Sequence, residues 1–127
     1  MQPTMNSEEL YQSAMRLDSK GDYQGSISIY KELAKTSNDP RHLIAYGVCL
    51  QRLGHWKQSI IPLEKGISLR PPYCEGDARL FLAKAYFNSG KKRLAIKQWQ
   101  HVAEMQPEYP SYESVQNEAK KMLSEHA

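Results

Sequence analysis

The chain has little of what sites for covalent or metal chemistry require. Its 127 residues include two cysteines, Cys49 and Cys74, which are too few for a disulfide framework. The four histidines are scattered, and none forms an HExxH or a paired Cys/His spacing, so no metal site is expected. Glycine-rich phosphate loops and the Gly-x-Ser-x-Gly turn of hydrolases are also absent. We therefore expect no enzyme, no catalytic residue and no cofactor.

Long apolar runs are absent as well. No stretch of about 18 apolar residues occurs, which excludes a membrane-spanning helix from this sequence. Residues 1–10 contain no basic residue and no apolar core, so we expect no signal peptide and a cytoplasmic location. No segment alternates apolar and polar residues over the length of a strand. The apolar content of 40% and charged content of 24% are ordinary for one globular domain.

Acidic residues are scarce in the middle of the chain. Residues 41–101 carry eleven Lys/Arg and three Asp/Glu, a net charge of +8. The flanking segments 1–40 and 102–127 have net charges of −2 and −3, which gives +3 for the whole chain. A basic middle between acidic ends favours an acidic partner or acidic self-contacts, and an ordinary solvated helical surface is the alternative.

Apolar residues recur three to four positions apart in several stretches, which is the spacing of one helical face. Within residues 41–71, one such stripe runs up to Gly54 and a second follows it, which predicts two helices packed back on each other around a tight turn. Asn6 and Glu9 have the spacing of a capping box, so the first helix should begin near Ser7.

Three turn glycines organise the sequence. Gly21, Gly54 and Gly90 are separated by 33 and 36 residues, and internal periods of this size are typical of stacked helix hairpins. Small residues return seven positions before each glycine and five after it, and large apolar residues return nine after it. The recurring sets are Ala14, Gly47 and Ala83; Ser26, Ser59 and Ala95; and Tyr30, Leu63 and Trp99.

This register resembles the tetratricopeptide repeat (TPR) family, whose unit of about 34 residues has this glycine, these small positions and a closing proline. The resemblance implies an all-α fold, a right-handed α-solenoid of three helix-turn-helix units. The implied divisions are an N-terminal extension (1–6), three repeats (7–39, 40–75 and 76–109) and a capping helix with tail (110–127). A single hairpin cannot bury its apolar face alone, so the units should stack.

In this family the first helix of each unit lines a concave wall, so the resemblance also implies a partner-binding groove. An apolar wall with a basic rim would suit a short apolar or amphipathic, partly acidic segment of another protein. The alternative is that the last helix or a neighbouring copy covers the wall. The implied groove residues are Tyr11, Met15, Asp18, Ser19, Arg41, Ile44, Val48, Gln51, Arg52, Leu80, Lys84, Phe87 and Asn88.

Some TPR proteins bind the C-terminal carboxylate of chaperones through Lys, Asn and Arg side chains on this wall. The matching positions here hold none of these residue types, so we expect no such clamp; they are Tyr11, Met15, Ala45, Asp77 and Phe81. In size and wall character the chain is similar to three-unit bacterial secretion chaperones. We therefore expect a protein–protein interaction module, such as an adaptor, scaffold or chaperone-like protein.

Two other functions compete with groove binding. A basic edge formed by Lys91, Lys92, Arg93 and Lys97 could bind an acidic protein or a nucleic acid. No aromatic-plus-glycine motif of nucleic-acid-binding proteins accompanies these residues. An ordinary solvated turn is the plainer interpretation. The apolar wall could also join copies of the chain into a homo-oligomer.

Overall fold

The computed structural model describes residues 5–71, 74–107 and 112–127, and within them it is entirely helical. Residues 1–4 of the predicted extension and residues 110–111 of the predicted capping segment lie outside the described residues. The helices are α1 (Ser7–Ser19), α2 (Tyr23–Thr36), α3 (Pro40–Arg52), α4 (Trp56–Ser68), α5 (Glu75–Asn88), α6 (Lys92–Glu104) and α7 (Glu113–His126). The expected all-α class is confirmed.

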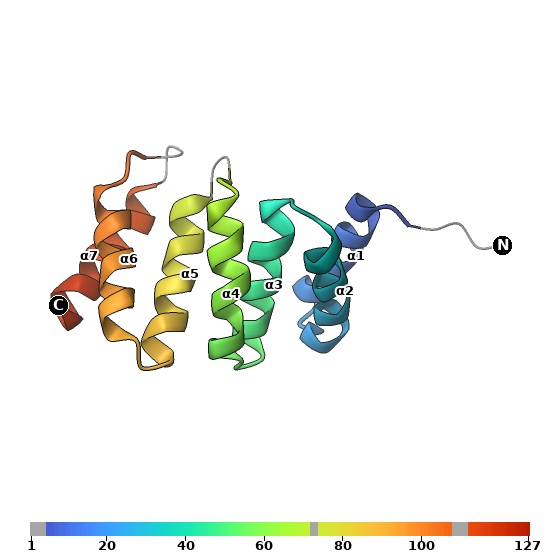
Figure 1. Cartoon of the computed structure of the whole chain (residues 1–127), viewed down its shortest axis with the longest axis horizontal. Helices are drawn as coiled ribbons and strands as arrows, with labels where there is room; N and C mark the ends of the chain where they lie inside the picture. The colour runs from blue at the N-terminus through green and yellow to red at the C-terminus, as the bar shows by residue number, and fades with distance from the viewer. Residues whose placement is uncertain (1–4, 72–73, 108–111) are drawn as a thin grey trace.

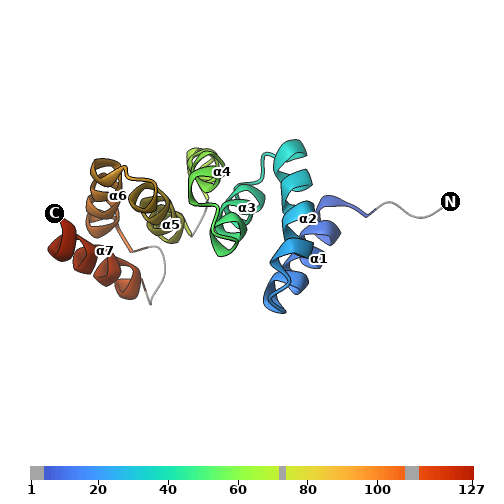
Figure 2. The same cartoon turned by 90° about the horizontal axis from the view of Figure 1, so that it is seen from below.

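The helices form a single row in which each packs on its neighbours in sequence (Figure 1). In Figure 2, α3, α5 and α7 lie along one side of the row, and α4 and α6 lie along the other. The row is curved, and the side that carries α1, α3, α5 and α7 is its inner side. This is the α-solenoid that the repeat pattern predicted, with α7 packed against the last hairpin.

The three turns repeat the same backbone geometry. Gly21, Gly54 and Gly90 have φ angles of 80°, 82° and 79°, a left-handed conformation that glycine adopts without steric penalty. After each glycine, the next N–H reaches back to a carbonyl five residues earlier; the Asp22 N–H, for example, donates to the Leu17 carbonyl at 2.9 Å. This Schellman arrangement satisfies the helix end and reverses the chain in three residues.

The small and large positions of the repeat meet inside each hairpin. The recurring residues Ala14 and Ala83 are fully buried, and Gly47 takes the same place in α3. A Cβ atom on Gly47 would lie 2.6 Å from Cγ of Leu63, which is itself fully buried in α4. The absence of a side chain at residue 47 is therefore what lets α3 and α4 approach each other.

The core has two parts. The larger apolar cluster runs from Ile60 in α4 to Ala119 in α7. The smaller cluster holds Ala14, Tyr30 and Leu33 of the first hairpin together with Cys49 of α3. The first hairpin therefore joins the solenoid through a smaller apolar contact than the one that holds the later helices together.

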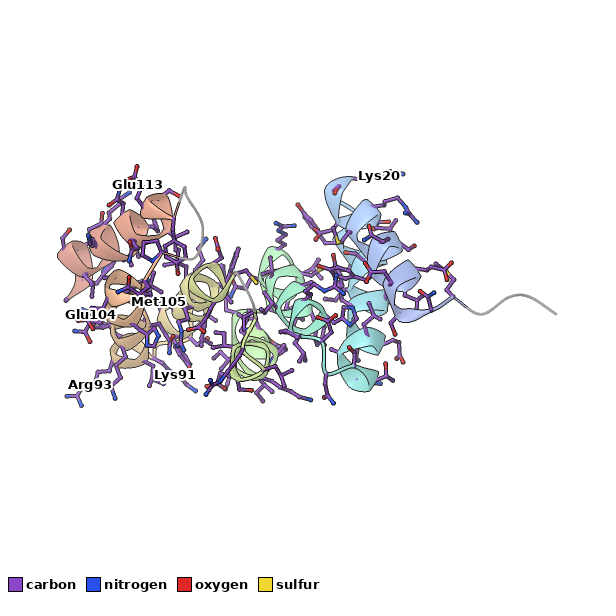
Figure 3. All side chains as sticks on the ribbon, turned by 90° about the horizontal axis from the view of Figure 1, so that it is seen from above. Lys20, Lys91, Arg93, Glu104, Met105 and Glu113 are labelled. Atoms are coloured by element: carbon purple, nitrogen blue, oxygen red, sulfur yellow. The ribbon has the colours of Figure 1, made fainter. Side chains whose placement is uncertain are left out.

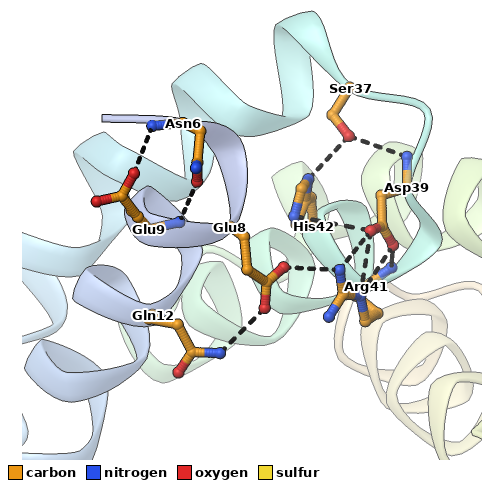
Figure 4. Close-up of polar contacts among 8 residues, drawn as sticks. All are labelled: Asn6, Glu8, Glu9, Gln12, Ser37, Asp39, Arg41 and His42. Atoms are coloured by element: carbon orange, nitrogen blue, oxygen red, sulfur yellow. Dashed lines mark hydrogen bonds and ion pairs between the residues drawn. The ribbon is translucent and has the colours of Figure 1, made fainter. Parts of the chain in front are cut away.

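A polar network adds to this joint between the first and second hairpins (Figure 4). The Arg41 guanidinium at the start of α3 donates to the carboxylates of Asp39 at 2.7 Å and Glu8 at 3.0 Å, and it lies over the ring of Tyr11. The hydrogen bonds from Gln12 and Arg41 lower the pKa of Glu8, and those from Arg41 lower the pKa of Asp39. Glu8 is thus tied to α3 across the joint.

The start of α1 has the capping box that the sequence predicted. The Asn6 side chain accepts a hydrogen bond from the Glu9 N–H at 2.8 Å, and the Glu9 carboxylate accepts one from the Asn6 N–H at 3.2 Å (Figure 4). The two exchanged bonds satisfy donors that would otherwise be left unpaired at the helix end.

His42 is the buried member of the joint, with 2% of its surface exposed. Its Nδ1 atom lies 2.8 Å from the Ser37 hydroxyl, and its ring is 5.0 Å from that of Tyr11. Its Nε2 atom is buried, has no hydrogen-bond partner among the described residues and lies 3.9 Å from the Asp39 carboxylate. Burial lowers the pKa of the imidazole below its ordinary value of 6.5, against the opposing effect of Asp39.

Gly47→Ala should destabilise the protein. Replacing an exposed helical glycine with alanine usually stabilises a protein. Here the new methyl group collides with Leu63, so we expect the free energy of unfolding to fall by about 1–2 kcal/mol. In a Leu63→Ala background the space over residue 47 is empty, so Gly47→Ala should stabilise the protein. Urea unfolding of the four variants measures this coupling, and equal effects of Gly47→Ala in both backgrounds would contradict the close approach.

Stability should fall as the pH drops below about 7, because of His42. The unfolded chain takes up a proton near pH 6.5, whereas folded His42, with its lowered pKa, takes it up only at lower pH. In that window stability should decline by at most about 1.4 kcal/mol per pH unit. Asp39 and Glu8, whose pKa values are also lowered, add their own loss only below about pH 4.5.

Thermal unfolding at pH 7.5, 6.5 and 5.5 tests the assignment to His42. His42→Gln should flatten the decline, because the amide does not titrate. His55→Gln provides the control, since His55 is exposed in the α3–α4 turn. The stability of this variant should decline with falling pH as much as that of the original chain. An unchanged decline in the His42 variant would show that another group is responsible.

Candidate functional site

The inner side of the solenoid carries most of the apolar residues that the resemblance assigned to a groove. Ile44 and Val48 on α3 and Leu80 on α5 are half-buried, and Met15 on α1 is 38% exposed. Ile44, Leu80 and Phe87 pack at the border of the larger core cluster. These side chains therefore fill part of the interior and still present apolar surface on the inner side.

A pocket of about 420 Å³ lies at the C-terminal end of this side, between α5 and α7. We call it the groove pocket. Its exposed lining is mainly apolar, as in most ligand sites. Four predicted groove residues come together here, and five further residues complete the lining. The full set is Asp77, Leu80, Phe81, Lys84, Phe87, Asn88, Trp99, Glu118 and Met122.

Sequence reasoning missed the part of the pocket that α6 and α7 contribute. Trp99, one of the recurring large residues of the repeat, is 2% exposed and also lines the pocket. Glu118 and Met122 come from α7, whose position against α5 the repeat pattern did not specify. The spacing of Glu118 and Met122, four residues apart on one helical face, was the signal available in the sequence.

The last helix covers part of the predicted wall. The His126 ring lies 4.6 Å from the Phe87 ring and stacks on Trp99 at 5.7 Å. Phe87 is thus partly covered by the chain's own C-terminal helix, the alternative that the sequence left open. Leu80 and Lys84 remain on the pocket lining beside it, so the cover is partial.

The first half of α7 is fixed to the end of α6. The Gln116 amide donates to the Met105 carbonyl at 2.7 Å and lies within 3.4 Å of the Val102 and Ala103 carbonyls. Tyr112 is fully buried against Gly76 of α5, where a Cβ atom would collide with its hydroxyl group. One wall of the groove pocket is therefore held by specific contacts at its base.

Gln51 is more buried than the other predicted wall residues. The resemblance placed it on the groove wall, but only 7% of its surface is exposed. Its amide donates to the Phe81 carbonyl at 2.7 Å and to the Ser59 hydroxyl at 3.3 Å. The bond to Phe81 joins the second hairpin to α5, so the amide nitrogen of Gln51 is held by the chain itself.

The expected basic rim is largely neutralised within the chain. Arg41 binds Asp39 and Glu8, which raises its pKa further, and lies over Tyr11, which is half-buried. Arg52 forms an ion pair with Asp18. Lys84 is exposed and forms no ion pair within the described residues, and it shares the groove pocket with two carboxylates, so this end has no excess of positive charge.

Asp18 is occupied by the chain itself. The Tyr30 hydroxyl donates to its carboxylate at 3.2 Å, and burial together with this carboxylate raises the pKa of Tyr30. Tyr86 on α5 likewise donates to Glu64 at 2.5 Å, and burial raises the pKa of its hydroxyl. Both tyrosines are buried hydrogen-bond donors that fix neighbouring helices.

The basic edge begins three residues after Asn88 of the groove pocket. Lys91, Lys92, Arg93 and Lys97 are all exposed, in the α5–α6 turn and the first turns of α6. In Figure 3, Lys91 and Arg93 extend from the same side of the row of helices. Among the described residues, no group of His, Cys, Asp and Glu is arranged to hold a metal ion. None of the described helices is both long and apolar enough to span a bilayer.

Cys49 is a free thiol in α3. Cys49 is buried beside the Ser26 hydroxyl at 3.4 Å, and burial raises the pKa of its thiol, which makes it less reactive.

No protein-family model matches the sequence, and no curated protein matches it. Solved structures share its fold. SycD, the type III secretion translocator chaperone of Yersinia enterocolitica, has a TM-score of 0.79 at 19% identity over 94% of this chain and 88% of that chain. SycD in complex with a peptide of the translocator YopD has a TM-score of 0.83 at 19% identity over 93% and 89%.

PcrH in complex with the chaperone binding region of PopD has a TM-score of 0.82 at 20% identity, over 98% of this chain and 96% of that chain. PcrH is a protein of Pseudomonas aeruginosa. At these identities the likeness concerns the fold, which is all-helical and TPR-like over nearly the whole chain.

Proposed function

We propose that this chain is a chaperone-like module that binds a segment of another protein on the inner side of the solenoid, with the groove pocket as its main anchor site. The observation that carries the proposal is the apolar pocket between α5 and α7, which the half-buried Leu80 and Phe87 of α5 help to line. The structures of SycD with a YopD peptide and of PcrH with a region of PopD support it, since both have this fold.

The pocket favours one large apolar side chain of the partner. Burying about 100 Å² of apolar surface stabilises a complex by roughly 2.5 kcal/mol before the losses of ordering are subtracted. Leu80, Phe87 and Met122 would supply the apolar contacts. Asp77, Lys84 and Glu118 all line the pocket, so both signs of charge are present there and charge alone does not select the anchor.

The rest of the partner segment would run along α3 toward α1. Ile44, Val48 and Met15 would offer weaker apolar contacts there, and Arg41 and Arg52 would mainly hold their own carboxylates in place. We therefore expect recognition by spaced apolar residues rather than by acidic residues bound at a basic rim. A chaperone-like binder of this kind acts by covering such residues and performs no chemistry.

Leu80→Asp should abolish peptide binding. A random library of displayed 12-residue peptides, selected on the original chain, should enrich sequences with spaced large apolar residues. The charge that the substitution places in the groove pocket would have to be desolvated by the anchor, so we expect affinity to fall at least about tenfold. Fluorescence anisotropy with an enriched peptide measures the loss.

Ile61→Asp is the matched control. Ile61 lies on α4, on the outer side of the row, and 74% of its surface is exposed. The same change in chemistry there should leave peptide affinity intact, and circular dichroism should show both variants folded. Equal affinities of the two variants, or no enrichment in the selection, would refute groove binding.

Self-association is the competing use of the same apolar surface. SycD has been seen as an alternative dimer, which concerns that protein. Light scattering over a concentration series separates the two uses, because a groove that is filled by a second copy should release it when an enriched peptide is added.

A further inference from the structure

Three helices begin at the edge of the solenoid that carries the glycine turns, and only one of them has an acidic cap. A helix N-terminus has unpaired N–H groups and partial positive charge, which such caps normally satisfy. At α2, the Asp22 carboxylate accepts a hydrogen bond from the Gly25 N–H at 2.8 Å. At α4 and α6 the capping positions hold His55 and Lys91, which make no side-chain cap, and neither first turn contains an acidic residue.

Basic residues occupy the first turns of α4 and α6 instead. Lys57 lies in the first turn of α4, and the basic edge begins α6. All five of these side chains are exposed, and none takes part in an ion pair within the part of the chain that the structure describes. Positive charge at the positive end of a helix is unfavourable within the chain alone, and a bound anion would reverse this.

A hollow of about 400 Å³ brings the two helix starts together. We call it the basic hollow. Lys57 and Lys91 both line it, one from each side, together with Gln58 and Ser89. The Ser89 hydroxyl is buried and makes no hydrogen bond with the described residues. In Figure 1 the Gly54 and Gly90 turns that frame this hollow lie next to each other along the lower edge.

The basic hollow adjoins the groove pocket, because Asn88 lines both. The Asn88 amide donates to the Lys84 carbonyl at 2.8 Å, so it lies between the two sites as a fixed partition. A polypeptide that leaves the groove pocket past Asn88 therefore reaches the ammonium groups of Lys91 and Lys57 next. This continuity favours a peptide over a separate anionic polymer as the occupant.

We infer that the basic hollow and the basic edge bind an acidic stretch of the same partner whose apolar anchor occupies the groove pocket. The inference rests on the proposed function and adds the position and chemistry of a second contact. Lysine ammonium groups on flexible stems pair with carboxylates without a fixed geometry, and several cations on one surface favour consecutive Asp or Glu residues. The contact would steer the partner and weaken with salt.

The test uses three labelled probes: deca-glutamate, the enriched groove peptide, and the same peptide with four glutamates added at either end. Deca-glutamate should bind the original chain with an affinity that falls steeply between 50 and 300 mM salt. Glutamates added at one end of the groove peptide should tighten binding about tenfold, and those at the other end should not. Anisotropy titrations measure all three.

Lys57→Glu with Lys91→Glu should remove both deca-glutamate binding and the gain from the added glutamates. Lys120→Glu with Lys121→Glu is the matched control, because it changes net charge equally on exposed residues of α7 away from the hollow. Equal losses in the two double variants would overturn the inference, since they would report net charge alone. No binding of deca-glutamate by the original chain would overturn it as well.

A fourth probe, deca-thymidylate, separates a protein partner from a nucleic acid. Tighter binding of this probe than of deca-glutamate, with the same dependence on Lys57 and Lys91, would overturn the choice of an acidic peptide. Leu80→Asp keeps the two proposals distinguishable: it should abolish binding of the plain groove peptide and leave deca-glutamate binding unchanged. Loss of both in that variant would show that the hollow depends on the groove and is not an independent contact.

Discussion

The close approach of two helices inside each hairpin is the constraint on which the rest of the structure depends. At the second hairpin, the space over Gly47 is filled by Leu63, and the left-handed Gly54 turns the chain back at the distance that this contact needs. The same arrangement recurs at the first and third hairpins, so each presents its first helix to the inner side. The position of the inner surface is thus set by the backbone geometry of the turn glycines and of the small residues that face the second helix of each hairpin.

Much of this could be predicted from the sequence, because the repeat constrains backbone and packing together. The turn at each glycine, the burial of Ser26 and Ser59 and the capping box at Asn6 all follow from local patterns with one physical solution. The surface was less predictable. Gln51 has the position of a wall residue, but a bond to the Phe81 carbonyl of the next hairpin holds it inside, and sequence spacing does not report such a partner.

The internal partners of the predicted rim cations were equally hard to predict from the sequence. Arg41 and Arg52 have the positions of rim cations, yet each finds a carboxylate on the first hairpin, Glu8 and Asp18. Those partners are more than thirty residues away in sequence, so only the stacked structure reveals the pairs. The groove pocket was not predicted for a related reason. Met122 and Glu118 line it from α7, which lies outside the repeat and whose placement depends on Gln116 and Tyr112.

The division of the core has a mechanical consequence. The later helices share one continuous apolar cluster. The smaller cluster at the first hairpin has four buried residues, three of them in the hairpin itself, and a polar network around Arg41 adds to it. Because the cluster at this joint has fewer buried apolar residues, we expect the end that carries α1 and α2 to open at a lower free-energy cost than the end that carries α5 to α7. A ligand that contacts both ends of the solenoid would use part of its binding free energy to order the end that carries α1 and α2. A ligand confined to the other end would not.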